Sequence, residues 1–119
     1  MSTTITSDAA LTDGIRLLAE TGARGSLTDL TDFEWDAVHV FAEGARRDEI
    51  EAAAGSPVVR DRRYYDAGNL LVFTNGDDVV KAVSILPDLL VFEHPTWSAR
   101  VRLEPVGDDV PALLRLVEP

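Results

Sequence analysis

The sequence predicts an α+β fold in which two helices pack on one face of a mainly antiparallel sheet of about four to six strands. Helical spacing of apolar residues is confined to the first half of the chain, whereas β-type runs separated by short gaps fill the part after residue 68. Short gaps suit antiparallel strands, and a parallel sheet would need crossover helices that this half does not supply. The expected order is helix, strand, helix and then five strands.

Length and composition are those of one ordinary globular domain spanning residues 1–119. The chain is 45% hydrophobic and 27% charged, and a domain of this size buries roughly two thirds of its unfolded surface. It has no cysteine, which excludes disulfides, thiolate metal sites and thiol nucleophiles. We expect no cofactor.

The first helix is predicted over residues 8–21. Apolar residues recur there at helical spacing: Leu11, Ile15 and Leu18. Ser7 or Thr12 offers an N-cap, and Gly22 ends the pattern.

A strand covered on both sides is predicted next. Alternate residues form one face: Phe33, Trp35, Ala37, His39 and Phe41. Val38 and Val40 make the second face apolar as well, which indicates a buried strand.

A short second helix is expected over residues 45–55, which contain good helix formers with acids in the early turns. Its buried residues would be Ile50, Ala53 and Ala54, with Gly55 following the last turn and only a weak cap at Gly44.

A hairpin is predicted over residues 68–86 with its turn at residues 75–78, because Asn-Gly tolerates the positive φ angles of tight turns. A shorter and a longer loop are both compatible with the sequence. Their registers differ in the pairs formed, Val72 with Val79 in the first and Phe73 with Val80 in the second.

Further strands are predicted at residues 89–94 and 96–104. In the second of these, alternation places one set of side chains in the core, namely Trp97, Ala99, Val101 and Leu103. Arg100 and Arg102 should be more exposed. The tail after residue 105 could form a short helix or a final strand, and we favour the strand.

The formal net charge is −10, from 21 acidic and 11 basic residues. This charge repels nucleic acid and anionic membranes at long range. The N-terminus lacks a signal-peptide pattern, and no apolar run reaches the length of a membrane span. The sequence therefore predicts a soluble, cytoplasmic protein that binds neither nucleic acid nor membrane.

Residues suited to catalysis or metal binding are few. The two histidines, His39 and His94, belong to no metal-ligand spacing. Nucleophile and phosphate-loop motifs are absent from the sequence. An acidic group precedes and enters the first strand: Asp29, Asp32, Glu34 and Asp36. We expect these acids to form a solvated edge, and we assign no catalytic residue.

One segment stands out in so acidic a chain, Arg-Asp-Arg-Arg-Tyr-Tyr at residues 60–65. Arginine offers a planar donor fork and tyrosine a rigid amphipathic ring, and both are enriched at protein interfaces. The predicted protein-binding residues are Arg60, Arg62, Arg63, Tyr64 and Tyr65. We expect them at the surface between the second helix and the hairpin, with at least one tyrosine ring partly exposed.

The pattern Phe33-Glu34-Trp35-Asp36-Ala37-Val38-His39-Val40-Phe41, followed by Glu49-Ile50 and Leu70-Leu71-Val72-Phe73, resembles a group of small uncharacterised bacterial proteins. These share a similar strand, a short helix and a hairpin strand over residues 33–85. The resemblance supports the predicted topology and brings no assigned activity, because strand patterns recur across folds.

Two functional hypotheses follow. The first is a non-enzymatic protein-binding or regulatory module, such as an adaptor, an inhibitor or an immunity-type protein. The alternative is a small-ligand carrier or enzyme with a pocket on the sheet face, lined by Trp35, His39 and Tyr65.

Overall fold

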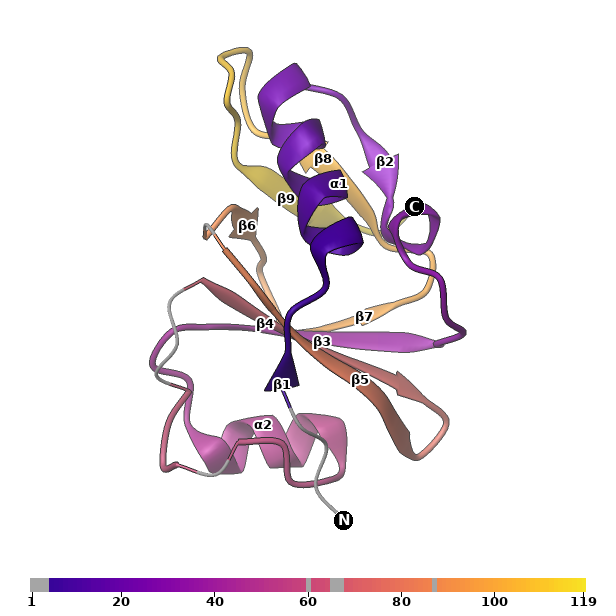
Figure 1. The fold of residues 1–119 in the computed structure, drawn as a ribbon, viewed down its shortest axis with the longest axis vertical. Coiled ribbons are helices and arrows are strands. Elements are labelled where there is room, and N and C mark those ends of the chain that lie inside the picture. The colour runs from indigo at the N-terminus through magenta and orange to yellow at the C-terminus, as the bar shows by residue number, and fades with distance from the viewer. Residues whose placement is uncertain (1–4, 60, 65–67, 87) are drawn as a thin grey trace.

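The structure is a computed structural model that describes residues 5–59, 61–64, 68–86 and 88–119. Over these residues the chain is an α+β fold with two α-helices and two sheets, of five and four strands (Figure 1). Both sheets are mostly antiparallel, and each contains one parallel pair, β1 with β5 and β6 with β9. The sequence predicted one sheet, so the division into two is a correction.

The larger sheet has the order β1-β5-β4-β3-β7, with bounds Ile5–Thr6, Asp78–Ile85, Asn69–Asn75, Ala37–Ala42 and Thr96–Ser98. The smaller sheet has the order β2-β8-β9-β6, with bounds Gly25–Ser26, Arg102–Pro105, Leu114–Val117 and Leu90–Val91. A 3₁₀ turn, η1 (Leu27–Leu30), follows β2.

The two helices, α1 (Ala9–Thr21) and α2 (Arg47–Ala54), cover opposite faces of the larger sheet (Figure 1). The prediction that both pack on one face is therefore wrong. Strand β3 buries Val38 and Val40 in the cluster with α1 and the smaller sheet, and Phe41 in the cluster with α2. Because both faces of the central strands are apolar, both need cover.

Helix α1 matches the predicted span. Its N-cap is Asp8, in place of the expected Ser7 or Thr12, and the Asp8 carboxylate accepts a hydrogen bond from the Leu11 N–H at 3.0 Å. Gly22 ends the helix with φ +71°, as predicted. An aspartate at this position satisfies a backbone donor that the helix itself cannot pair.

Helix α2 is also confirmed. Ile50 and Ala54 are buried as predicted, Ala53 is only half-buried, and Gly55 follows the last turn with φ +79°. The N-cap is Arg46 rather than Gly44, and no side chain caps it.

Strand β3 begins later than the alternation suggested. Regular pairing starts at Ala37, so the alternation of side chains between the two faces of β3 does not extend back to Trp35. The Trp35 ring instead lies 5.0 Å from Phe73 and joins the cluster of Val38, on the face opposite the one predicted. The expectation that β3 is covered on both faces is confirmed.

The hairpin β4–β5 forms where predicted, with Asn75 paired to Asp78. A register shift follows between Phe73 and Thr74, so that Phe73 pairs with Lys81. Neither predicted pair, Val72 with Val79 or Phe73 with Val80, is present. A bulge accommodates an extra residue on one strand, a third outcome that the two regular registers did not include.

The predicted strand 96–104 is divided between the sheets, because residues 99–101 turn from β7 into β8. The predicted burial is correct for Trp97, Val101 and Leu103, which are more buried than Arg100 and Arg102. Ala99, also predicted in the core, lies in the turn and is only half-buried. The tail forms strand β9, as favoured. Among the described residues, no helix is long and apolar enough to cross a membrane.

Candidate functional site

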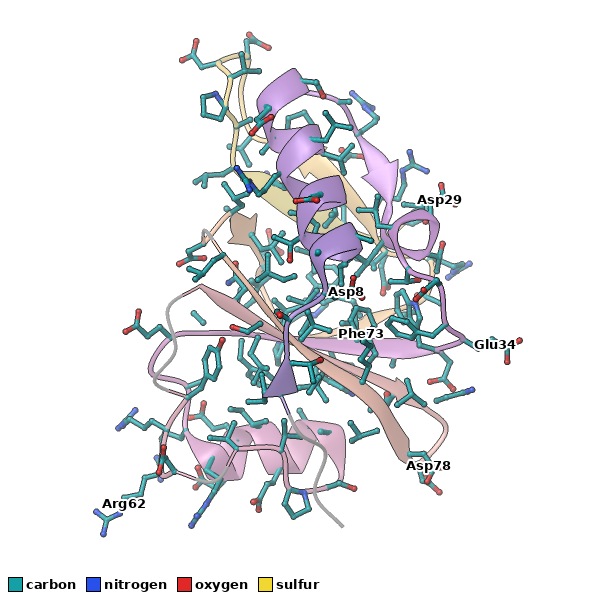
Figure 2. All side chains as sticks on the ribbon, in the orientation of Figure 1. Asp8, Asp29, Glu34, Arg62, Phe73 and Asp78 are labelled. Carbon is teal, nitrogen blue, oxygen red and sulfur yellow. The ribbon has the colours of Figure 1, made fainter. Side chains whose placement is uncertain are left out.

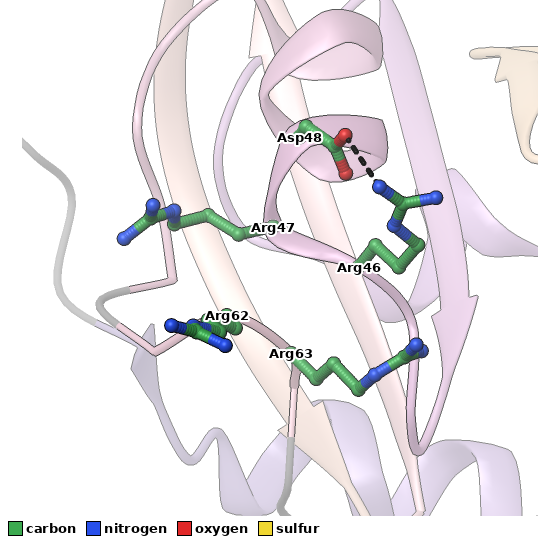
Figure 3. A pocket seen from close by; sticks show the side chains of 5 residues that line it. All are labelled: Arg46, Arg47, Asp48, Arg62 and Arg63. Carbon is green, nitrogen blue, oxygen red and sulfur yellow. Dashed lines mark hydrogen bonds and ion pairs between the residues drawn. The ribbon is translucent and has the colours of Figure 1, made fainter.

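Four arginines gather beside the start of α2 and line a cavity of about 400 Å³ together with Asp48. We call this set the arginine surface: Arg46, Arg47, Arg62 and Arg63. All four are exposed. In Figure 3 the guanidinium groups of Arg46 and Arg63 point to one side of the paired backbone, and those of Arg47 and Arg62 point to the other.

Backbone pairing brings these arginines together from two separate segments. The Arg47 N–H donates to the Arg62 carbonyl at 2.7 Å, and the Tyr64 N–H donates to the Ala45 carbonyl at 2.8 Å. These bonds flank an antiparallel bridge between Arg46 and Arg63. This is the non-hydrogen-bonded type of pair, in which facing side chains lie closest.

Placing two arginines directly opposite each other is electrostatically unfavourable, because like charges across a strand pair destabilise it. Local partners offset part of this repulsion. Arg46 contacts the Asp48 carboxylate at 3.1 Å, and Arg63 donates to the Gly44 carbonyl at 2.8 Å. The Arg46 and Asp48 side chains are 57% and 69% exposed, so this ion pair contributes little to stability. The guanidinium groups of Arg46 and Arg63 therefore stay exposed to solvent while they make these contacts.

The predicted protein-binding residues differ in whether the structure places them at the surface. Arg62 and Arg63 lie at the surface, as expected. Tyr64 does not: it is 1% exposed and its hydroxyl hydrogen-bonds to Ser84, so it is a core residue. The bridge between the two segments turns Tyr64 inward against the sheet. Arg60 and Tyr65 lie outside the described residues.

Arg46 and Arg47 were missed by the sequence analysis, which assigned them only to the start of a helix. The signal available was the repeated Arg-Arg pair, at residues 46–47 and 62–63. Only the backbone pairing of the two segments shows that both pairs line one cavity.

The residues of the alternative pocket do not meet in the described part of the chain. Trp35 borders a cavity of about 330 Å³ with residues of η1 and the hairpin. His39 borders another, of about 430 Å³, with the end of α2 and the hairpin turn. Trp35 and His39 therefore face different cavities, and Tyr65 lies outside the described residues.

His39 is 6% exposed, and both of its ring nitrogens contact threonine hydroxyls. Nδ1 lies 2.9 Å from Thr96 Oγ1, and Nε2 lies 3.3 Å from Thr74 Oγ1. Burial lowers the pKa of His39, partly opposed by the charge of Asp36. The ring therefore acts as a hydrogen-bonding group within the sheet, where burial disfavours its charged form.

The acidic group predicted before and within the first strand lies apart from the arginine surface (Figure 2). Figure 2 shows Arg62 pointing outward on the opposite side of the molecule from Asp29 and Glu34. Asp32, Glu34 and Asp36 are exposed, and Asp36 accepts a hydrogen bond from the Gly76 N–H at 2.9 Å. In the part of the chain that the structure describes, no three His, Asp or Glu side chains gather as metal ligands.

Comparison of the chain with family models, curated proteins and solved structures found no match. The resemblance to small bacterial proteins stays a prediction.

Proposed function

We propose that the protein is a non-enzymatic binding module that uses the arginine surface to hold carboxylates of a partner protein. Guanidinium groups bind carboxylates through paired, parallel hydrogen bonds, and they keep their charge at every physiological pH. Arginine is also among the residues that contribute most to binding energy at interfaces. Tyr64 is not part of this proposal, because it is buried.

One observation carries the proposal: the pairing of residues 44–47 with 62–64 gathers four arginines around one cavity in a chain of net charge −10. Asp48 illustrates the chemistry within the protein itself. Its carboxylate is held by the Arg46 guanidinium at 3.1 Å and by the Glu49 N–H at 3.0 Å. A partner carboxylate would use the same kinds of donor.

The test is titration of the protein with a fluorescein-labelled oligo-glutamate peptide, followed by anisotropy at low salt. The double variant Arg46→Ala/Arg63→Ala removes the facing pair of the bridge. We expect it to weaken binding by about tenfold or more, the scale of lost interface anchors. The matched control is Arg16→Ala/Arg24→Ala, which removes the same charge from exposed positions on and just after α1.

Because both double variants change the net charge equally, long-range repulsion of the peptide rises equally in each. Equal loss of binding in the two variants would therefore overturn the proposal. A third variant, Arg46→Lys/Arg63→Lys, keeps the positive charge and removes the planar guanidinium group with its paired N–H donors. Weakened binding there would show that guanidinium geometry contributes beyond charge.

A further inference from the structure

An apolar groove of about 450 Å³ lies next to the arginine surface, between the end of β3 and the segment that precedes β7. Its apolar lining consists of Val40, Phe41, Ala42, Ala45, Phe92 and Pro95. Phe41, on the face of β3 that packs against α2, lies at the base of the groove and is buried, whereas Ala42 and Pro95 are exposed at the rim. This volume lies within the range of ligand-binding pockets.

The groove lies where a sheet edge opens. Strand β7 pairs only with residues 37–39 of β3, and one further bond joins the Val40 N–H to the Pro95 carbonyl at 2.8 Å. Strand β3 continues to Ala42 beyond this bond. The Ala42 carbonyl accepts a hydrogen bond from the Ala45 N–H at 3.1 Å, so only a short stretch of this edge is left for an extended segment, and the apolar groove would hold its side chain.

Two carboxylates are the charged groups that line the groove itself, and the arginine surface begins beside them at Arg46. Glu43 and Glu49 are its only polar lining residues within the described chain, and both are exposed. Neither forms an ion pair with another described residue. The apolar floor with an acidic rim is complementary to an apolar side chain flanked by a basic one. The net charge of −10 would also attract such a segment at long range.

We propose that this groove binds an extended, basic segment of a partner protein, with an aliphatic or aromatic side chain on Phe41 and a lysine or arginine at Glu43 and Glu49. The proposal concerns a second surface and does not depend on the arginine surface. The two surfaces meet along residues 45–49, so one partner that carries both charge signs could contact them together.

The probe is a fluorescein-labelled peptide of alternating leucine and lysine, compared with a version in which serine replaces leucine. The test variant is Ala42→Gln, which places a larger neutral side chain at the exposed rim. Ala52→Gln is the matched control, because Ala52 is exposed on α2 and does not line the groove. Thermal unfolding of both variants checks that each is folded.

We expect Ala42→Gln to weaken binding of the leucine-lysine peptide about tenfold and Ala52→Gln to leave it unchanged. The serine peptide should bind the unmodified protein weakly. A second variant, Glu43→Gln/Glu49→Gln, should also weaken binding of the leucine-lysine peptide. Equal binding of the leucine-lysine and serine peptides would overturn the proposal, because it would show that the peptide binds only to the general negative charge. Equal effects of Ala42→Gln and Ala52→Gln on binding would overturn it as well.

The two proposals fail separately in these assays. Arg46→Ala/Arg63→Ala should leave the leucine-lysine peptide bound, and Ala42→Gln should leave the oligo-glutamate peptide bound. If Arg46→Ala/Arg63→Ala abolished binding of the leucine-lysine peptide, the groove would not be an independent site, and the inference would be wrong.

Discussion

Asp8 connects the start of α1 to the larger sheet, and its replacement gives the sharpest test of how the fold is held together. One carboxylate oxygen accepts a hydrogen bond from the Leu11 N–H at 3.0 Å, and the other accepts one from the Lys81 ammonium group of β5 at 2.9 Å. The Asp8 and Lys81 side chains are 14% and 32% exposed. The contact is therefore better shielded from solvent than the other ion pairs between described residues.

Two substitutions separate the two roles. Asp8→Ala removes the cap, worth about 1 kcal/mol, and with it the ion pair. Asp8→Asn keeps a capping oxygen and loses only the charge, so it should cost no more than about 1 kcal/mol, the upper end for an ion pair near the surface. We therefore expect Asp8→Ala to lower the free energy of unfolding by about 2 kcal/mol.

The pH dependence gives an independent check on Asp8. The hydrogen bond from the Leu11 N–H, followed by the bond from Lys81, lowers the pKa of Asp8 below its ordinary value. The folded state therefore binds this proton less readily than the unfolded state. The contribution of Asp8 is present above the unfolded pKa, near 3.9 for an aspartate, and is lost as the pH falls through the folded pKa.

The assay is urea unfolding followed by tryptophan fluorescence, at neutral pH and near pH 3, with Lys81→Met completing a double-mutant cycle. The difference between Asp8→Asn and the unmodified protein should shrink in acid. An Asp8→Asn variant as destabilised as Asp8→Ala at neutral pH would refute the separation of cap from ion pair. Additive effects of Asp8→Asn and Lys81→Met would refute the ion pair itself.

Four further outcomes are expected. His39→Gln should flatten the pH dependence of the free energy of unfolding in mild acid. Because the pKa of His39 is lowered in the folded state, the contribution of the neutral ring to stability is present above the unfolded pKa and is lost as the pH falls below about 6.5, which urea titrations across that range would show. Tyr64→Phe should cost about 1 kcal/mol through loss of the bond to Ser84, and equal stability in thermal melts would contradict this. Gly68→Ala should be strongly destabilising, because Gly68 has φ +90° and a Cβ there would lie 2.0 Å from a backbone carbonyl oxygen; a folded variant with an unchanged melting temperature would count against it. Duplex DNA should not bind at physiological salt, because the net charge is −10, and a shifted band at sub-micromolar protein would be the contrary result.

Local features of the fold could be predicted from the sequence because short-range forces determine them. Helix α1 and its end at Gly22 follow from apolar spacing and from the freedom of glycine at positive φ. The hairpin turn follows from Asn75-Gly76 for the same reason. The burial of Trp97 and Leu103 followed from alternation, even though a turn between them places them in different sheets.

The arrangement of those elements was decided by tertiary packing. Alternation predicted one strand through residues 33–41, but Trp35 packs on the opposite face because regular pairing begins only at Ala37. Likewise, the apolar character of both faces of β3 was visible in the sequence, but not that α1 would cover one face and α2 the other. A periodic pattern specifies which side chains need burial, and the partner surface depends on contacts between distant segments.

The candidate site divides in the same way. The sequence alone determined that an arginine cluster stands out in an acidic chain, and it identified Arg62 and Arg63 as exposed residues. Only the tertiary structure added Arg46 and Arg47 and removed Tyr64, through the pairing of residues 44–47 with 62–64. Composition records how much charge a chain carries. The position of that charge on the surface depends on hydrogen bonds between segments far apart in the sequence, because such bonds bring charged side chains of different segments to the same cavity.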